Sequence, residues 1–285
     1  MSGQVADPIS APGARWMILA MLFAARTVMA FQFQSLPALG PVLVQDLGID
    51  YTLFGTLVGL FMLPGVVFAI PGGVLGQRFG DKRIAVLGLG LMAIGGLLVA
   101  LAPSVPLLTA GRLCSGIGGV LLNIILAKMV TDWFAGREIV LAMALFVSSW
   151  PFGIGLALLI LPLLASTSGT SFALGSTAVL SIIALMVVAA AYRVPVGYVA
   201  APATFRLQLS GREWALSVLS GLVWGLYNVG FILLLVFGPS FLASRGMPVA
   251  TAGATASIAT WTILPFSAAR RVFGPARGSR SARLL

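Results

Sequence analysis

Residues 84–102 read IAVLGLGLMAIGGLLVALA, an unbroken run of 19 residues without a charged or polar side chain. A helix that crosses about 30 Å of hydrocarbon needs about 20 consecutive apolar residues, so this run has the composition and length of a transmembrane helix. A strand of a membrane β-barrel would instead alternate apolar and polar residues over about ten positions. The run therefore predicts an all-α membrane protein.

The rest of the chain has the same character. Of its 285 residues, 59% are hydrophobic and 8% are charged, whereas about 25% of the residues of an average soluble domain are charged. Too few charges remain to cover a water-soluble globule, and the apolar content is far too high for a disordered chain. We expect most of the protein surface to face lipid, which makes the bilayer the first predicted partner.

Eight apolar segments of this kind follow one another along the chain. They are residues 16–44, 53–76, 84–102, 107–130, 139–164, 172–192, 214–242 and 250–268. Short gaps separate most of them, as is typical of antiparallel neighbours in a helical bundle. The exception is 193–213, which contains two prolines and three arginines and which we interpret as a polar linker between two bundles.

Basic residues are distributed unevenly over these gaps. If the N-terminus is cytoplasmic, the cytoplasmic segments hold 14 Lys and Arg residues and the outer segments hold only Arg245. Because basic loops stay on the cytoplasmic side, we expect both termini and the linker there, in a multi-pass protein of a bacterial inner membrane. Orientation then explains the net charge of +10, and no basic face interleaved with aromatic residues indicates nucleic acid binding.

The reactive residue types are scarce. The chain has no histidine and a single cysteine, Cys114, which lies inside an apolar segment. Disulfides are therefore excluded, metal clusters lack ligands, and the usual general base of an enzyme is missing. We expect a protein that is not an enzyme and that needs no metal or cofactor.

An internal repeat emerges when the chain is shifted by 198 residues. Seven identities then fall in register without a gap, among them Trp16 on Trp214 and Gly40-Pro41 on Gly238-Pro239. Internal repeats are common in secondary transporters. On this interpretation residues 16–192 form a complete six-helix bundle, and residues 214–268 form two helices of a second one.

The two ends complete the predicted organisation. Residues 1–15 are a cytoplasmic N-terminal tail, and residues 269–285 are a basic tail. The basic tail is either an arm attracted to anionic lipid or aberrant sequence. Since a second bundle of two helices is shorter than the first, we expect a chain truncated at its C-terminal end, and an eight-helix protein complete in itself is the alternative.

The segment between the second and third spans, residues 73–83, reads GVLGQRFGDKR. It resembles the signature loop of the major facilitator superfamily, whose pattern is G-x-L-a-D-r-x-G-r-k. Five positions match that pattern: Gly73, Leu75, Arg78, Gly80 and Lys82. Two depart from it, because Gln77 stands where the family has Asp and Asp81 stands where the family has a basic residue.

The resemblance implies a loop with a conformational role. Its glycines allow a tight turn, and its charges pair with helix ends in one conformation and release them in the other. We assign this role to Gly73, Arg78, Gly80, Asp81 and Lys82. A second stretch, RLCSGIGG at residues 112–119, is similar to the family pattern R-x-x-q-G-x-g of helix 4, which leaves Arg112 with either a coupling role or a structural one.

What the resemblance implies about activity is alternating-access transport of a small solute. Within the superfamily, the general character of the sequence resembles the anion permeases of the cyanate and nitrate type. Two alternatives remain: a membrane sensor or assembly protein that keeps the fold without transport, and an inactive truncated transporter. The residues do not decide the oligomeric state.

Arg26 is the first candidate for binding, because it lies near the middle of the first span. A central arginine costs about 2.5–3.5 kcal/mol on insertion scales, so such residues are usually functional. Its planar fork suits a carboxylate or a similar anion, although a structural arginine bonded to carbonyls is the alternative. The other substrate-binding candidates are Gln32, Gln34, Asn123, Tyr227 and Asn228, each of which could equally form an interhelical hydrogen bond.

Overall fold

The computed structural model describes residues 12–102, 104–136, 138–195 and 210–272, and these residues form eleven helices and no strand. The helices are α1 (Pro12–Phe33), α2 (Ser35–Ala38), α3 (Gly40–Leu47), α4 (Tyr51–Gly59), α5 (Pro64–Phe79), α6 (Asp81–Ala100), α7 (Val105–Phe134), α8 (Ile139–Ser168), α9 (Thr170–Ala191), α10 (Gly211–Ser244) and α11 (Val249–Val272). The predicted all-α membrane class is confirmed. Residues 1–11, most of the predicted linker and the basic tail from residue 273 lie outside the described residues.

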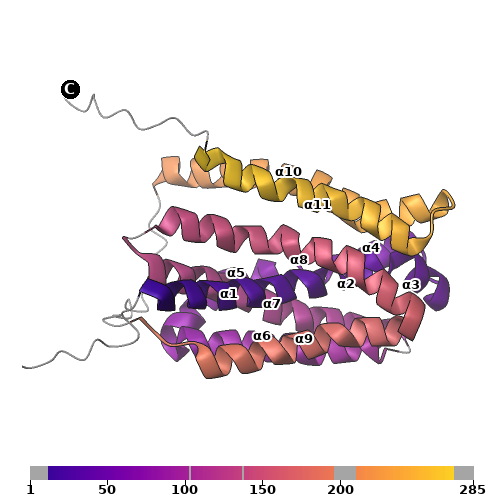
Figure 1. Cartoon of the computed structure of the whole chain (residues 1–285), viewed down its shortest axis with the longest axis horizontal. Coiled ribbons are helices and arrows are strands. Elements are labelled where there is room, and N and C mark those ends of the chain that lie inside the picture. The colour runs from indigo at the N-terminus through magenta and orange to yellow at the C-terminus, as the bar shows by residue number, and fades with distance from the viewer. Residues whose placement is uncertain (1–11, 103, 137, 196–209, 273–285) are drawn as a thin grey trace, which may run out of the picture.

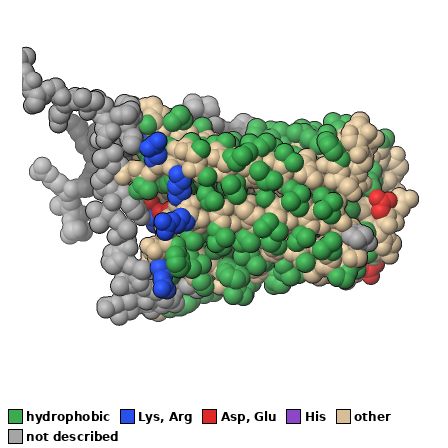
Figure 2. All heavy atoms as spheres, turned by 90° about the horizontal axis from the view of Figure 1, so that it is seen from below, with side chains coloured by type: hydrophobic (Ala, Val, Ile, Leu, Met, Phe, Trp, Pro, Cys, Tyr) green, Lys and Arg blue, Asp and Glu red, His purple; other side chains and the backbone are tan. Residues whose placement is uncertain are grey.

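Within that part of the chain, seven helical segments are long and apolar enough to cross a membrane. They correspond to the first seven predicted spans, and α11 takes the position of the eighth. The long helices run side by side in Figure 1, with α6 and α9 along one edge, α10 and α11 along the opposite edge, and α1, α7 and α8 between them. Most Lys and Arg side chains on the face in Figure 2 gather at the end where α1 begins, while apolar side chains cover the middle.

Two of the predicted spans are broken rather than continuous. The predicted span 16–44 consists of α1, α2 and α3, and the predicted span 53–76 consists of α4 and α5. Proline occupies the first turn of both α3 and α5, at Pro41 and Pro64. Because proline has no N–H to donate to the preceding turn, a new helix starts there more readily than an old one continues.

Glycine allows the first bundle to pack closely. A Cβ atom at Gly88 of α6 would lie 2.8 Å from the carbonyl oxygen of Gly118 on α7, and one at Gly111 would lie 2.8 Å from the carbonyl oxygen of Gly95. Both distances are too short for any other residue, so the backbones of α6 and α7 touch. Small residues commonly allow such close contact between membrane helices.

The buried side chains form two clusters. One lies entirely within the first bundle, among α1, α6, α7, α8 and α9, and includes Leu22, Met92 and Phe146. The other joins the first bundle to α10 and α11, and includes Phe33, Phe54 and Leu235. The second cluster lies at the end where α2, α3 and α4 are found, and it closes that end of the space between the bundles.

Candidate functional site

A cavity of about 540 Å³ lies between α1, the turn that joins α4 to α5, and helices α5, α7, α8 and α10. Four of the predicted binding residues line it: Arg26, Asn123, Tyr227 and Asn228. Ligand pockets for small molecules usually measure about 300–1,000 Å³. The fold thus brings residues of three helices, up to about 200 positions apart in the chain, around one space of a suitable size.

Arg26 is held in the cavity wall by two neighbouring helices. Its Nε donates to Oδ1 of Asn123 at 3.2 Å, and its Nη1 donates to the carbonyl oxygens of Phe146 and Val147 at 3.1 and 3.2 Å. The carbonyl of Val147 lies four residues before Pro151, which has no N–H to offer it. Arg26 therefore supplies a donor that the proline has removed from α8.

The guanidinium of Arg26 keeps part of its capacity to donate hydrogen bonds. It has five N–H donors, of which the contacts above use the one on Nε and those on Nη1, and no described residue accepts from Nη2. Its flat face lies over the ring of Phe146, at 4.7 Å from the centroid. Arg26 thus has both the predicted structural contacts to carbonyls and a donor nitrogen left for a ligand.

The two asparagines have amide orientations that their partners determine. Arginine can only donate, so the oxygen of Asn123 faces Arg26 and its amide nitrogen is turned away as a further donor. The amide nitrogen of Asn228 donates to the carbonyl oxygen of Trp224 at 2.8 Å, which leaves its oxygen as the free group. The first bundle therefore presents donors to the cavity, and α10 presents an acceptor.

Gln32 and Gln34 do not line this cavity. Both are buried, and Nε2 of Gln32 donates to the carbonyl oxygen of Met92 at 2.8 Å and to Oγ of Ser115 at 3.2 Å. Nε2 of Gln34 donates to the carbonyl oxygen of Leu235 at 2.8 Å. That carbonyl lies four residues before Pro239 and has lost its helical donor. The positions of the two glutamines favour the interhelical alternative over substrate contact.

Arg112 lies beside the cavity, enclosed by backbone. Only 1% of its surface is exposed, and its three nitrogens make five hydrogen bonds of 3.2–3.5 Å to carbonyl oxygens. These carbonyls belong to the last turns of α1 and α4, at Gln32, Phe33, Leu57 and Val58. Carbonyls in a last turn lack intrahelical donors, so Arg112 satisfies them where both spans are broken. This geometry is that of a structural residue.

The predicted loop between the second and third spans is largely helical. α5 continues to Phe79 and α6 begins at Asp81, so only Gly80 connects them. Gly80 has a φ of +89°, a conformation that side chains rarely tolerate. The expectation that Gly73 lies in a turn is wrong, because Gly73 lies inside α5.

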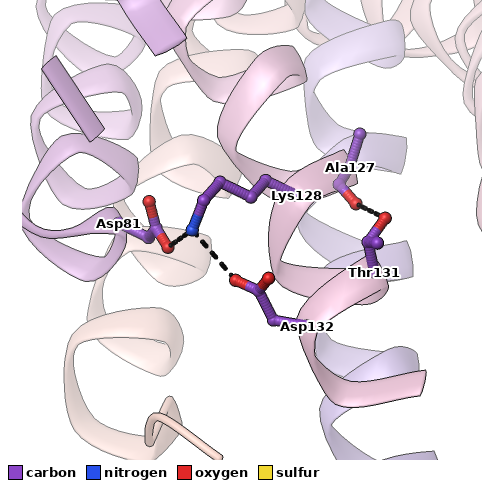
Figure 3. Close-up of polar contacts among 5 residues, drawn as sticks. All are labelled: Asp81, Ala127, Lys128, Thr131 and Asp132. Atoms are coloured by element: carbon purple, nitrogen blue, oxygen red, sulfur yellow. Dashed lines mark hydrogen bonds and ion pairs between the residues drawn. The ribbon is translucent and has the colours of Figure 1, made fainter. Parts of the chain in front are cut away.

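A small charge cluster fixes the start of α6 (Figure 3). Lys128 of α7 contacts the carboxylate of Asp81 and lies 3.0 Å from Oδ2 of Asp132, one turn further along α7. Asp81 also complements the positive end of the α6 dipole. All three residues belong to the first bundle. Neither Arg78 nor Lys82 has a carboxylate partner in the part of the chain that the structure describes.

Comparisons with known proteins agree with this architecture. The model of the Major Facilitator Superfamily matches residues 18–283, nearly the whole chain. The chain belongs to the Major Facilitator Superfamily. It has several helices long and apolar enough to cross a membrane, and the resemblance seen in residues 73–83 is confirmed at the family level.

The superfamily relatives are distant and longer. An uncharacterized transporter of Buchnera aphidicola subsp. Schizaphis graminum is 27% identical over 156 residues, which are 55% of this chain and 39% of the relative. The cyanate transport protein CynX of Escherichia coli K12 is 26% identical over 223 residues, which are 77% of this chain and 57% of that protein. The chain spans about half the length of these relatives.

Solved structures of other transporters share the superfamily fold. A bacterial homologue of the human lysosomal transporter Spinster, in an inward-facing and unoccupied conformation, superposes with a TM-score of 0.72 at 16% identity, covering 96% of this chain and 66% of that one. The peptide transporter POT in complex with alafosfalin gives a TM-score of 0.57 at 20% identity, covering 80% of this chain and 49% of the other.

The sequence did not predict most of the aromatic residues that line the cavity. Six aromatic residues line it: Phe33, Phe61, Trp150, Trp224, Tyr227 and Phe231. Only Tyr227 was a candidate. The spacing of Trp224, Tyr227 and Phe231, at i, i+3 and i+7, places them on one face of α10 and was a usable signal. Phe33, Phe61 and Trp150 come from α1, the turn between α4 and α5, and α8, so no sequence spacing links them.

Proposed function

We propose that this transporter moves a small monoanion by alternating access and that Arg26 is the residue that binds the negative charge. The observation that carries the proposal is the unused Nη2 of Arg26 in the wall of the cavity. A guanidinium that is already pinned by three hydrogen bonds is preorganised, because little side-chain entropy is lost when an anion binds.

The charge balance of the cavity favours a single negative charge. Arg26 is the one ionisable residue with a full charge among the described lining residues. An anion with one charge leaves the site neutral, whereas an anion with two charges leaves one of them unpaired against a mostly apolar lining. The donors of Arg26 and Asn123 suit the oxygens of a carboxylate or a similar group.

The closed end of the cavity suggests which conformation this is. The hydrogen bond from Gln34 to Leu235 joins the first bundle to α10, and the rings of Phe54 and Phe237 meet edge to face beside it. The first half of α10, in contrast, is exposed at almost every residue from 211 to 230. With the basic end in the cytoplasm, these contacts would form an outer gate, and the cavity would be open to the inside.

Binding and exchange by the purified chain test this function. We expect saturable binding of a labelled monoanion, and we expect Arg26→Gln to abolish it without reducing the folded fraction. Liposomes preloaded with the unlabelled anion should then accumulate the labelled one by counterflow. Binding without exchange would favour a sensor of the same fold or an inactive truncated transporter, and wild-type binding by Arg26→Gln would contradict an anion site at Arg26.

Cysteine labelling from either side of the membrane tests the orientation. Cys114 is first replaced by serine, and single cysteines are introduced at Ser104 and Ser168, which precede α7 and end α8. We expect an impermeant maleimide to label both from the outside of intact cells. Arg193→Cys, just after α9, is the matched position that should react only after the cells are opened, and labelling in the opposite pattern would reverse the orientation.

A further inference from the structure

The lining of the cavity separates into one charged corner and a largely apolar remainder that includes six aromatic residues. Arg26 and Asn123 form the corner, and six of the 23 lining residues are aromatic. A triatomic anion such as cyanate would fill a small part of about 540 Å³ and would leave the aromatic surface in contact with water. The shape and chemistry of the site therefore point to an anion with a sizeable apolar body.

The aromatic residues form two separate sets. On the first bundle, the ring of Phe33 contacts those of Phe61 and Trp150, with centroids 5.5 and 5.3 Å apart. Phe33 and Phe61 are only 3% and 2% exposed, so Trp150 supplies most of the accessible aromatic face of this set. On α10, the ring of Tyr227 contacts those of Trp224 and Phe231, with centroids 5.9 and 6.0 Å apart. Among the described residues, no ring contact joins the first set to the second, although both line the same cavity.

Two aromatic walls with a space between them suit a flat ring. Aromatic pairs prefer offset-stacked or edge-to-face contacts with centroids about 4.5–7 Å apart. The near-parallel Tyr227 and Phe231, with an interplanar angle of 11°, extend one wall along α10. Trp150 connects this aromatic space to the charged corner, because the guanidinium of Arg26 lies 5.9 Å from its ring centroid.

We propose that the substrate is an aromatic monocarboxylate, whose carboxylate binds at Arg26 and Asn123 and whose ring lies between the two aromatic walls. This inference rests on the proposed function and narrows it from monoanions in general to a planar organic acid. A saturated ring of the same size would bury a similar area but would lack the flat π face.

The test is equilibrium binding by the purified 285-residue chain of five probes: benzoate, cyclohexanecarboxylate, benzamide, nitrate and cyanate. We expect the affinity for benzoate to be at least about tenfold higher than that for nitrate, cyanate or benzamide. Nitrate and cyanate lack the ring, and benzamide lacks the charge. Cyclohexanecarboxylate should bind about three- to tenfold more weakly than benzoate, which is the size of an aromatic pair contact.

Matched tryptophan variants locate the ring. Trp150→Leu should weaken benzoate binding about tenfold and nitrate binding much less, because nitrate has no ring to contact, whereas Trp214→Leu, a tryptophan of α10 outside the cavity, should change neither. Circular dichroism and size-exclusion profiles check that both variants are folded.

Each outcome separates this inference from the proposed function. Nitrate or cyanate binding as tightly as benzoate would overturn the aromatic substrate while leaving an anion site at Arg26. Benzamide binding as tightly as benzoate would overturn both proposals, as would a chain that binds none of the five probes. Cyclohexanecarboxylate binding as tightly as benzoate would overturn the aromatic walls alone.

Discussion

The two arginines inside the membrane-spanning helices, Arg112 and Arg26, differ in how completely the backbone uses them. All three nitrogens of Arg112 donate to carbonyls of two broken helices, in a place with 1% exposure. Arg26 donates to Asn123 and to two carbonyls near Pro151, and its Nη2 has no acceptor among the described residues. One arginine is saturated by the protein, and the other is not.

This difference gives a way to distinguish structural from functional charges in a membrane protein. An intramembrane arginine is commonly taken as a functional residue, yet Arg112 is deeper in the protein than Arg26 and has less to offer a ligand. The number of donors that remain after backbone contacts are counted is more informative than burial. The following experiments test this comparison.

Removal of Arg112 should have the largest effect on stability. Arg112→Met removes five hydrogen bonds to four buried carbonyls, of which those of Gln32 and Val58 keep a second donor in Ser35 Oγ and the Phe61 N–H. At about 0.6 kcal/mol for each of the five hydrogen bonds in a membrane protein, we expect a loss of roughly 3 kcal/mol. Reversible unfolding in mixed micelles measures it. Arg112→Lys should recover only part of the loss, because lysine cannot donate along two helix ends at once. Wild-type stability of the Arg112→Met variant would show that the hydrogen bonds of Arg112 do not stabilise the fold.

Removal of Arg26 should cost much less stability. Arg26→Met loses three hydrogen bonds, or about 1.8 kcal/mol at 0.6 kcal/mol each, but cavity water can replace part of this loss at an open site. We expect a change within about 1 kcal/mol of wild type in the same unfolding assay. A loss as large as that of Arg112→Met would make Arg26 a structural residue too.

Pro151 provides a finer test of the structural part of Arg26. Pro151→Ala restores the N–H that pairs with the carbonyl of Val147, so the contact from Arg26 to that carbonyl becomes redundant. We expect the cost of Arg26→Met to fall by about 0.6 kcal/mol in the Pro151→Ala background, the average of one membrane hydrogen bond. A double-mutant cycle measures this coupling, and zero coupling would mean that the contact contributes nothing.

The bond from Gln34 to Leu235 should have an effect on conformation rather than on folding. Gln34→Leu removes one contact between the bundles, worth about 0.6 kcal/mol, which shifts a two-state equilibrium by about threefold. With Cys114 replaced by serine, a cysteine at Ser240, which is 4% exposed at the closed end, should react faster with maleimide in the Gln34→Leu variant. Gln32→Leu, buried within the first bundle, is the control that should not change this rate.

The charge cluster at the start of α6 should have the smallest effect. The side chain of Lys128 is 26% exposed, and those of Asp81 and Asp132 are 10% and 18% exposed. We expect Lys128→Met to lower stability by about 0.5 kcal/mol or less, within the range for ion pairs near the surface. Because all three residues lie in one bundle, benzoate affinity should be unchanged. A large loss of binding would indicate that the cluster controls the cavity after all.

The sequence was sufficient for the fold class and the span positions because both follow from apolar run length. It also pointed to Arg26 and Asn123, which meet in the cavity wall, since polar residues inside apolar runs are few. It could not separate Arg26 from Arg112, because the contacts of both depend on where distant carbonyls lose their helical donors. The breaks at Pro41 and Pro64 were visible as residues, but whether a proline bends a helix or divides it depends on packing from other helices.

The most direct test of the comparison is anion affinity per folded protein for the conservative series at Arg26. For whichever of benzoate, nitrate and cyanate binds the wild type most tightly, we expect Arg26→Lys to bind about tenfold more weakly and Arg26→Gln about thirtyfold or more, as for a charge pair that loses one partner. Folded fraction is measured by fluorescence-detected size exclusion on the same samples. Arg26→Gln with wild-type affinity would contradict the assignment of Arg26 as the binding residue and would leave the two arginines with the same structural role.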